Sequence, residues 1–351
     1  MLHHPLTPSP TAVRSTRWTA PRITSVPRRF ALGCAAWLLL TAGGGALAQG
    51  AAQWPVKPVR LIVGWAPGGG VDVTARTMAI RLIEIWNQQV LVDNRPGAAG
   101  NLAGEMVARA STDGYTLLLG SAGELAINAG LFEKMPYDPV QDFSHISTAV
   151  RVPNAVVIHP SVPANTIKEL IAASQKAPNG YAFASPGNGS IGHLTGEMLR
   201  MITGAKLLHV PYKGAAPATA DLVGGQVQLS FSSMPAVLPF VKAGKLRMIA
   251  VTSGQRSAAA PELPTIAESG VPSFDAIGWY GFVGPSGMAR ELVVRINGDL
   301  AKALAIPDLR ERLVSQGLDP WPSSPAQMRA FVASEIIKWT RVIRQAGARV
   351  D

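Results

Sequence analysis

One short stretch, residues 59–76, constrains the fold of this chain more than any other. It starts with an apolar run at 59–63, passes through the turn Pro67-Gly68-Gly69-Gly70, and leads into helically spaced apolar residues over 71–86. The Val/Ile/Leu run predicts a buried strand, and the glycines allow a tight turn. A strand, a glycine loop and a helix N-terminus together can bind an anion, because unpaired N–H groups and the helix dipole face the loop. Taken alone, the motif is explained equally well by an ordinary turn that binds nothing.

A second unit of the same kind follows about 120 residues later. A strand is predicted at 181–185, a glycine turn at 186–190 and a helix at 191–202. The turn opens a Gly-x-Gly-x-x-Gly pattern, which is typical of dinucleotide sites. The acidic residue that such a site needs about 20 residues further on is missing from Leu-His-Val-Pro at 208–211. We therefore reject a dinucleotide and retain a second helix N-terminus that can receive an anion.

The first 48 residues predict a cleaved signal peptide. Arg28 and Arg29 precede an apolar run at 30–41, and Ala46-Leu47-Ala48 is a small-residue cleavage site. The apolar run is too short to cross a membrane as a helix. We expect Sec export rather than the twin-arginine route, because the flanks of the arginine pair fit that route poorly. With cleavage after Ala48, the protein is expected in the periplasm.

Charge and cysteine content limit the chemistry of the mature chain. The formal net charge is +10, but five arginines and no acid lie in the first 48 residues, which leaves 27 basic against 22 acidic residues. These charges are dispersed, without the basic runs of a nucleic-acid surface. The only cysteine, Cys34, lies in the signal segment, at the start of the apolar run, where a lipoprotein box does not fit. The mature chain is therefore expected to have no disulfide and no thiolate chemistry.

Alternating strand and helix patterns from Trp54 onward predict an α/β fold with mostly parallel sheets. The 351 residues, 47% of them hydrophobic, are enough for two domains. A long apolar segment at 146–158 is interrupted in its middle, and another covers 276–283; both are expected to cross between domains. The predicted division is 54–153 plus 276–351 for domain 1 and 154–275 for domain 2, with a ligand cleft between them.

No catalytic or metal motif stands out. The chain lacks a Walker A sequence and the G-x-S-x-G elbow of a serine hydrolase. Four residues could form a hydrolytic triad on paper: Ser185, Ser190, His193 and Asp221. Helix caps and a helix-face histidine explain them better. His193 and Glu197 have i,i+4 spacing, but no third metal ligand joins them. We expect a protein without enzymatic activity, metal or cofactor.

Three charged residues near the predicted turns each have two open roles. Lys213 could face a substrate or solvent. Asp72 could accept a hydrogen bond from a ligand, cap its own helix, or do both. Glu124 could face a cleft, where it would repel an anion unless it met a ligand amine or hydroxyl, or it could lie at the surface.

Together these motifs resemble one family over nearly the whole mature chain: the periplasmic solute-binding receptors of tripartite tricarboxylate transporters, the Bug family. The matching stretches are WPVKPVRLIV at 54–63, APGG at 66–69 with Asp72, NRPGAAGN at 94–101, DGYTL at 113–117, PYDP at 136–139, HVPYKG at 209–214 and GGQV at 224–227. The resemblance implies an α/β, two-domain Venus-flytrap fold of the type II periplasmic-binding-protein kind. Each domain would be a mostly parallel sheet flanked by helices.

The resemblance also implies a carboxylate clamp, because the family's two glycine loops face each other across the cleft and hold a ligand carboxylate, partly through water. The implied ligand-binding residues are Pro67, Gly68, Gly69, Asp72, Ser185, Gly187, Asn188, Gly189 and Ser190, and, more weakly, Ser121 and Ser232. Where the family often has Gly-Gly-Ser-Thr-Asp, this chain reads Gly69-Gly70-Val71-Asp72. Two hydroxyls are lost, so backbone N–H groups and Asp72 are expected to hold the ligand. Glu124 replaces a small or polar residue and can reshape the far end of the pocket.

These features predict a monomeric periplasmic receptor that captures a small organic-acid anion and delivers it to membrane carrier subunits, with no nucleic-acid partner. A periplasmic sensor that presents the bound acid to a signalling receptor would carry the same sequence. A secreted hydrolase is a third and weaker hypothesis. The sequence does not identify the acid, because side chains from several loops determine specificity.

Overall fold

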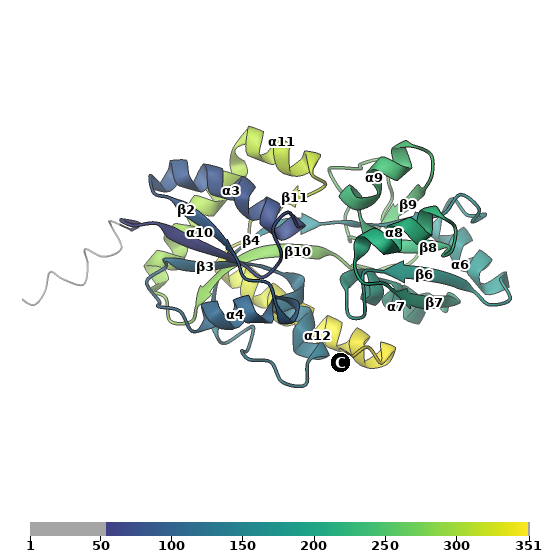
Figure 1. Ribbon diagram of the computed structural model, residues 1–351, viewed down its shortest axis with the longest axis horizontal. Helices are drawn as coiled ribbons and strands as arrows, with labels where there is room; N and C mark the ends of the chain where they lie inside the picture. Colours follow the sequence, from purple (N-terminus) through teal and green to yellow (C-terminus); the bar gives the residue numbers. More distant parts are fainter. Residues whose placement is uncertain (1–53, 350–351) are drawn as a thin grey trace, which may run out of the picture. The chain divides into compact units, whose positions relative to one another are not determined.

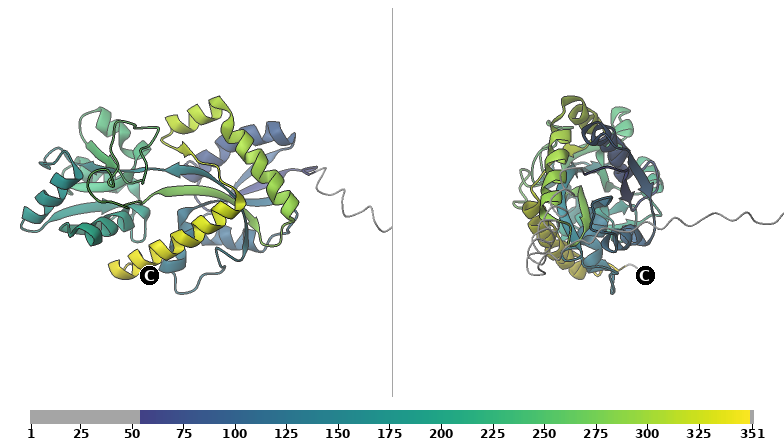
Figure 2. Two further views of the ribbon diagram at one scale, coloured as in Figure 1. Left: turned by 180° about the vertical axis from the view of Figure 1, so that it is seen from behind. Right: turned by 90° about the vertical axis from the view of Figure 1, so that its left-hand side faces the viewer.

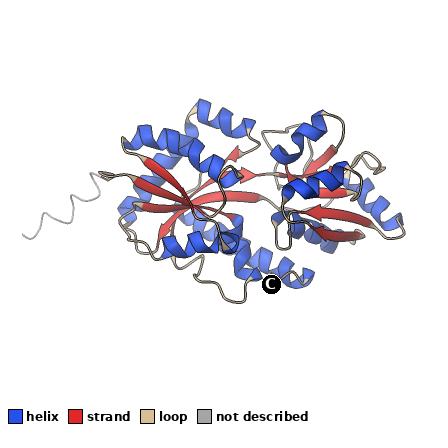
Figure 3. Ribbon diagram, viewed as in Figure 1, coloured by secondary structure: helices blue, strands red, loops and turns tan. Residues whose placement is uncertain are grey.

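The computed structural model describes residues 54–349, and the predicted signal peptide lies outside this range. Two β-sheets are each flanked by helices (Figure 1, Figure 3). Sheet A has the strand order β11-β4-β10-β3-β1-β2, and sheet B has the order β7-β6-β8-β5-β9. No helix within residues 54–349 is long and apolar enough to span a membrane.

The strands of sheet A are β1 (Val59–Val63), β2 (Val90–Asn94), β3 (Thr116–Ser121), β4 (Phe143–Val152), β10 (Gly278–Pro285) and β11 (Asp319–Pro320). Those of sheet B are β5 (Asn154–Ile158), β6 (Tyr181–Ser185), β7 (Leu207–Pro211), β8 (Leu229–Ser233) and β9 (Arg247–Val251). The two predicted strand–glycine–helix units are β1 with α3 (Gly70–Trp86) and β6 with α7 (Ile191–Thr203).

The other helices are η1 (Ala98–Gly100), α4 (Asn101–Ala108), η2 (Gly123–Ile127), α5 (Asn128–Leu131), α6 (Ile167–Lys176), α8 (Ala215–Val223), α9 (Met234–Lys242), α10 (Arg290–Ala305), α11 (Pro307–Ser315) and α12 (Pro325–Ala346). The last helix, α12, contacts β4 of sheet A and also α7 beside sheet B (Figure 2). It therefore joins the helical layers of both sheets.

The predicted α/β fold of two helix-flanked sheets is confirmed, but both sheets are mixed rather than mostly parallel. In sheet A, β1 is parallel to β2 and β3, but β10 is antiparallel to β3 and β4. In sheet B, β6 is parallel to β7 and β8, but β5 is antiparallel to β8 and β9. The chain passes between the sheets twice, through β4 into β5 and back into β10. A strand that enters a sheet at the edge where its neighbours end must run against them.

Sheet A is buried on both faces, which explains its continuous apolar runs. Leu61 and Ile62 are adjacent in β1 and are 1% and 0% exposed. Because successive side chains of a strand point to opposite faces, they enter different hydrophobic clusters. Leu61 packs in the cluster that contains Leu82 of α3, and Ile62 in the cluster that contains Val107 of α4.

Candidate functional site

A cavity of about 560 Å³ lies where strands of both sheets end. Its walls come from the segments that follow β1, β3, β6, β7 and β8, and from the first residues of β5 and β10. In α/β sheets, ligands bind beyond the carboxyl ends of the parallel strands. Here two sheets contribute that edge to the same space, and the volume suits a small molecule.

The glycine-rich loop before α3 forms part of the cavity wall. Gly68 has a φ of +83°, a left-handed conformation that favours glycine. A Cβ atom on Gly70 would lie 2.6 Å from the Tyr280 hydroxyl, so glycine lets α3 begin close to β10. Gly70 and Val71 line the cavity, and their N–H groups have no acceptor within residues 54–349.

Asp72 braces this loop and does not line the cavity. It is 2% exposed and accepts hydrogen bonds from the Gly68 N–H at 2.8 Å and from Asn94 Nδ2 at 2.9 Å. Arg76 Nε lies 3.0 Å from both carboxylate oxygens. Burial raises the pKa of Asp72, but its bonds to Arg76, Gly68 and Asn94 outweigh burial, and the pKa lies below its usual value. Asp72 is therefore ionised and occupied by its own loop.

The second loop also joins a strand to a helix through glycines, but different side chains hold it in place. Ser190 caps α7 by accepting from the His193 N–H at 3.3 Å, and its hydroxyl donates to the Gly187 carbonyl at 2.7 Å. Gly189 has a φ of +73°, again left-handed. A Cβ atom on Gly192 would lie 2.6 Å from the carbonyl oxygen of Phe231, so glycine is needed where α7 crosses the end of β8.

Two stacked histidines contact the second loop and hold it in place. The rings of His193 and His209 lie 3.7 Å apart at an angle of 11°. His193 Nδ1 accepts from the Gly189 N–H at 3.0 Å, and His209 Nε2 lies 2.6 Å from the Ser185 hydroxyl. Burial lowers the pKa of both histidines, that of His209 to about 4. A neutral His193 ring can accept the Gly189 N–H at Nδ1, and a cationic ring cannot.

The amides left for a ligand differ from those expected. Gly68, Gly187 and Gly189 each donate an N–H to a side chain of their own strand–loop–helix unit. Within residues 54–349, the N–H groups without an acceptor at the starts of the two helices and in the second loop are those of Gly70, Val71 and Asp72 in α3, Asn188 in the second loop, and Ile191 and Gly192 in α7. Most of them belong to first helical turns, where the helix dipole adds about half a positive charge. An anion in the cavity would face two such ends.

The cavity wall is uncharged and combines neutral polar side chains with a large apolar surface. No lining residue within 54–349 carries a charged side chain, and much of the wall is aromatic or aliphatic: Trp65, Ile127, Leu131, Ile191 and Trp279. An anion would therefore have to be bound by backbone N–H groups, neutral side-chain donors and helix dipoles, without a salt bridge from a lining residue. Apolar surroundings strengthen such hydrogen bonds by lowering the local dielectric.

Glu124 lies behind this wall, completely buried in η2. Its Oε2 accepts from the Ser121 hydroxyl at 2.5 Å and from Trp65 Nε1 at 3.2 Å, and both partners line the cavity. Its Oε1 is buried without a hydrogen-bond partner in the described part of the chain. Burial raises the pKa of Glu124. Glu124 thus positions two wall residues from behind and is not a surface residue.

The predicted site residues fall into two groups. Those that line the cavity are Gly69, Ser121, Gly187, Asn188, Gly189 and Ser190. Those that lie outside the lining are Pro67, Gly68, Asp72, Ser185 and Ser232. Asp72 and Ser185 brace the loops, and the Ser232 hydroxyl bonds to that of Ser230 at 2.9 Å. Contact of any of them with a ligand stays a prediction.

Sequence analysis missed several lining residues: Trp65, Asn154, Ser233, Trp279 and Tyr280. Trp279 and Tyr280 lie in the predicted crossing segment 276–283, and a strand that crosses a cleft must expose residues to it. Asn154 breaks the apolar segment 146–158 directly after Pro153, so its position was visible in the sequence but its role was not.

The alternative chemistries lack their geometry. Asp221 accepts a hydrogen bond from the Tyr212 hydroxyl at 2.7 Å and does not orient His193, so the residues considered for a hydrolytic triad do not form one. Glu197 pairs with Arg200 at 2.7 Å rather than joining His193 around a metal. Across residues 54–349, no three His, Cys, Asp or Glu side chains cluster in a way that could hold a metal ion.

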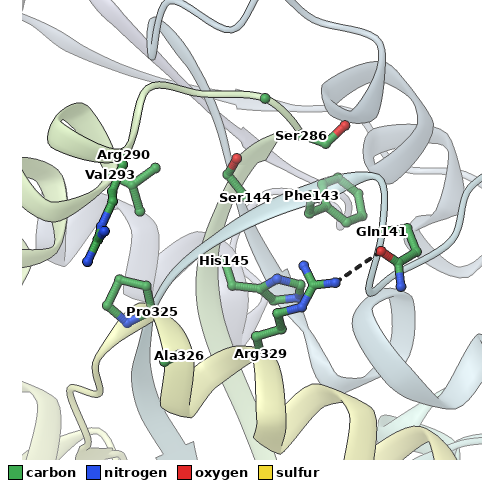
Figure 4. A pocket seen from close by; sticks show the side chains of 11 residues that line it. Gln141, Phe143, Ser144, His145, Ser286, Arg290, Val293, Pro325, Ala326 and Arg329 are labelled. Atoms are coloured by element: carbon green, nitrogen blue, oxygen red, sulfur yellow. Dashed lines mark hydrogen bonds between the residues drawn. The ribbon is translucent and has the colours of Figure 1, made fainter.

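A second hollow, of about 430 Å³, lies at the other ends of β4 and β10 (Figure 4). Arg329 of α12 borders it and donates to Gln141 Oε1 at 3.0 Å. β4 begins in this hollow with Phe143 and reaches the cavity with Val152, so the two spaces lie at opposite ends of one strand. None of the predicted site residues lines the hollow.

Comparison with known proteins identifies the family of this chain. Residues 74–348 match the family described as "Tripartite tricarboxylate transporter family receptor". Protein BugT of Bordetella pertussis is 36% identical over 314 residues, which cover 89% of this chain and 96% of BugT.

Solved structures agree in fold. An R. palustris protein solved with adipate (Rpa4515) is 36% identical, with a TM-score of 0.73 over 85% of this chain and 100% of that one. MatC from Rhodopseudomonas palustris, solved with bound malate, is 28% identical, with a TM-score of 0.68 over 83% of this chain and 100% of that one. The chain therefore belongs to the tripartite tricarboxylate transporter receptor family of periplasmic solute-binding proteins, as its motifs predicted.

Proposed function

We propose that this receptor captures an organic-acid anion by its carboxylate and presents it to the membrane subunits of a tripartite tricarboxylate-type transporter. The observation that carries the proposal is the pair of helix N-termini, α3 and α7, whose unpaired N–H groups border one cavity without any charged side chain. Two related receptors were solved with the carboxylates adipate and malate, which supports the same ligand class here.

The carboxylate would receive hydrogen bonds from both loops at once. Each backbone N–H bond to a charged oxygen contributes about 1.5–3 kcal/mol, and two helix dipoles add to this. Because α3 follows a strand of sheet A and α7 a strand of sheet B, a ligand held by both would draw the two sheets together. Closure would exclude water and strengthen the same bonds.

The proposed domains follow the two sheets. Domain 1 would comprise 54–153 and 276–351, and domain 2 would comprise 154–275. This division assigns every strand of sheet A to the first domain and every strand of sheet B to the second. The links would be Pro153, between β4 and β5, and the segment that leads from β9 to β10. Export, with cleavage after Ala48, and monomeric action as a binding protein without enzymatic activity complete the proposal.

Calorimetry on the purified protein, freed of co-purified ligand, tests the proposal against a panel of mono-, di- and tricarboxylates. At least one is expected to bind. Gly192→Ala is expected to weaken that binding at least tenfold, because its Cβ would meet the Phe231 carbonyl at 2.6 Å and displace the start of α7. Gly298→Ala is the control, since a Cβ there meets nothing within 4 Å. If no carboxylate binds, the proposal is wrong.

A further inference from the structure

The hollow at the start of β4 contains two arginines without a carboxylate partner. Arg290 is the first residue of α10, Arg329 lies in the second turn of α12, and both line the hollow. Arg329 donates to the Gln141 side chain at 3.0 Å, and neither guanidinium is ion-paired within residues 54–349. Asp142, the acid directly before β4, accepts from the Asp138 N–H at 2.7 Å and does not line the hollow. Because guanidinium groups stay protonated, the hollow carries two uncompensated positive charges.

His145 is a buried ring without a hydrogen-bond partner in the wall of the same hollow. It is 4% exposed, and neither Nδ1 nor Nε2 has a partner within residues 54–349. Figure 4 shows the ring extending from β4 toward the Arg329 guanidinium. Burial, and then the charge of Arg329, lower the pKa of His145 to about 4, although the nearby Pro139 carbonyl partly opposes this, so the ring is neutral and keeps one N–H. An unpartnered buried group is costly, so a native protein retains one where a ligand can supply the missing partner.

Two helices begin in the wall of the hollow. Arg290 and Pro325 are the first residues of α10 and α12, and both line it. The N–H groups of Arg290 and Glu291 in α10 and of Ala326 in α12 have no acceptor within residues 54–349. Each helix dipole adds about half a positive charge at its start. The hollow therefore combines two helix starts with two cationic side chains, whereas the first cavity has helix starts alone.

The donors of the hollow come from four parts of the fold. The hydroxyls of Ser144 in β4 and Ser286 after β10 line it and have no hydrogen-bond partner in the described part of the chain (Figure 4). His145 belongs to β4, and the two arginines belong to α10 and α12. A carboxylate presents its oxygens in one plane, but a phosphate or sulfate presents them in four directions. Arginine forks match such oxyanions by paired N–H bonds.

We propose that this hollow is a second anion site, which takes a tetrahedral oxyanion such as phosphate or sulfate. Arg290 and Arg329 bind its oxygens from two helices, and the His145 ring N–H donates to it from β4. The site is separate from the cavity where the glycine loops meet, because β4 begins in the hollow and reaches the cavity only with Val152. Occupancy of the hollow therefore does not require a ligand in the cavity.

Nuclear magnetic resonance on isotope-labelled protein tests this, with sodium phosphate titrated at neutral pH and the ionic strength held constant by sodium chloride. The His145 ring signals report on the hollow, and the amide signals of Gly70 and Ile191 report on the cavity. Phosphate is expected to shift the His145 signals to saturation, with a Kd of about 1 mM or lower, as several charge-assisted hydrogen bonds imply. Sulfate should bind with similar affinity, and acetate at least about fivefold more weakly.

Arg290→Gln and Arg329→Gln should each weaken phosphate binding about tenfold, because each removes a charged donor. Arg341→Gln is the matched control: Arg341 is exposed on the same helix as Arg329 but does not line the hollow, so the variant removes an equal charge and should change the Kd less than about twofold. Arg290 and Arg329 are themselves exposed, and thermal melting verifies that all three variants are folded.

His145 signals that do not shift, or that shift without saturating, would overturn the proposal. Equal weakening by Arg341→Gln and Arg329→Gln would do the same, because it would show an adventitious ion only. Acetate binding as tightly as phosphate would refute a site for a tetrahedral anion. Shifts confined to Gly70 and Ile191 would place the anion in the cavity alone, which would overturn the second site and leave the proposed function intact.

Discussion

The stacked pair of His193 and His209 predicts a loss of stability in mild acid. Both rings are held neutral by burial, and each accepts or shares a hydrogen bond beneath the second loop. Burial, and then the neighbouring His193, lower the pKa of His209 to about 4. Protonation would place a cation where His209 Nε2 now meets the Ser185 hydroxyl, and would put like charges in the stack.

The size of the effect follows from the difference between the folded and unfolded pKa. An unfolded histidine has a pKa of about 6.5, and each unit of difference corresponds to about 1.4 kcal/mol. His209 therefore contributes about 3 kcal/mol, the folded pKa being about 4. Because the folded value is the lower one, the unfolded chain takes up the proton first. The contribution is complete above pH 6.5 and is lost as the pH falls from there to about 4.

Urea unfolding of the wild type and of His209→Gln, measured from pH 8 to pH 4, tests this. Glutamine keeps a polar atom for the Ser185 hydroxyl but does not titrate. Between pH 7 and pH 4, the wild type should lose about 3 kcal/mol more of its unfolding free energy than the variant. Other titrating groups cancel in this comparison, since both proteins contain them.

His159→Gln provides the control, because His159 bonds to Ser161 at 2.7 Å beyond the other end of β5, away from the stack. Its pH profile should follow the wild type. Parallel profiles for the wild type and His209→Gln, within about 1 kcal/mol, would refute the link between the buried stack and acid lability.

Two further predictions concern the acids behind the cavity wall. Burial raises the pKa of Glu124, so the stability of the folded protein falls as the pH rises above the usual pKa of a glutamate. Glu124→Gln should therefore melt at a higher temperature than the wild type at pH 8 and lose that advantage at pH 4. An equal change in melting temperature at both pH values would contradict this. Asp72→Ala removes the acceptor from the Gly68 N–H and from Asn94 Nδ2 and should lower the unfolding free energy by about 2–4 kcal/mol in urea titrations, whereas a loss below about 0.5 kcal/mol would show that the loop holds without its brace.

Local chemistry explains why the two loop–helix units could be predicted. The left-handed backbone at Gly68 and Gly189 needs glycine whatever surrounds it, and Ser190 caps α7 from within the same turn. The partners of the loop amides could not be predicted in the same way. Gly189 donates to a helix residue four positions on, and that ring is held in place by His209 of another strand.

Side-chain direction explains why one of two neighbouring residues at a strand end lines the cavity and the other does not. Ser232 was predicted to contact the ligand, but its hydroxyl bonds to that of Ser230, on the same face of β8. The next residue, Ser233, lines the cavity instead. Because successive side chains of a strand alternate between faces, an uncertainty of one residue in the register changes which side chain faces the cavity.

The sequence alone determined the α/β class, the two anion-receptive helix starts and the family, because each depends on residues close together in the chain. Only the tertiary structure decided the mixed sheets, the place of Asn154 in the cavity wall and the buried position of Glu124. Those features arise where β5 and β10 enter their sheets beside strands that are distant in sequence. For example, Tyr280 of β10 pairs with Ser121 of β3. The packing of distant strands decides which polar groups face the cavity without a partner. No local sequence pattern encodes this.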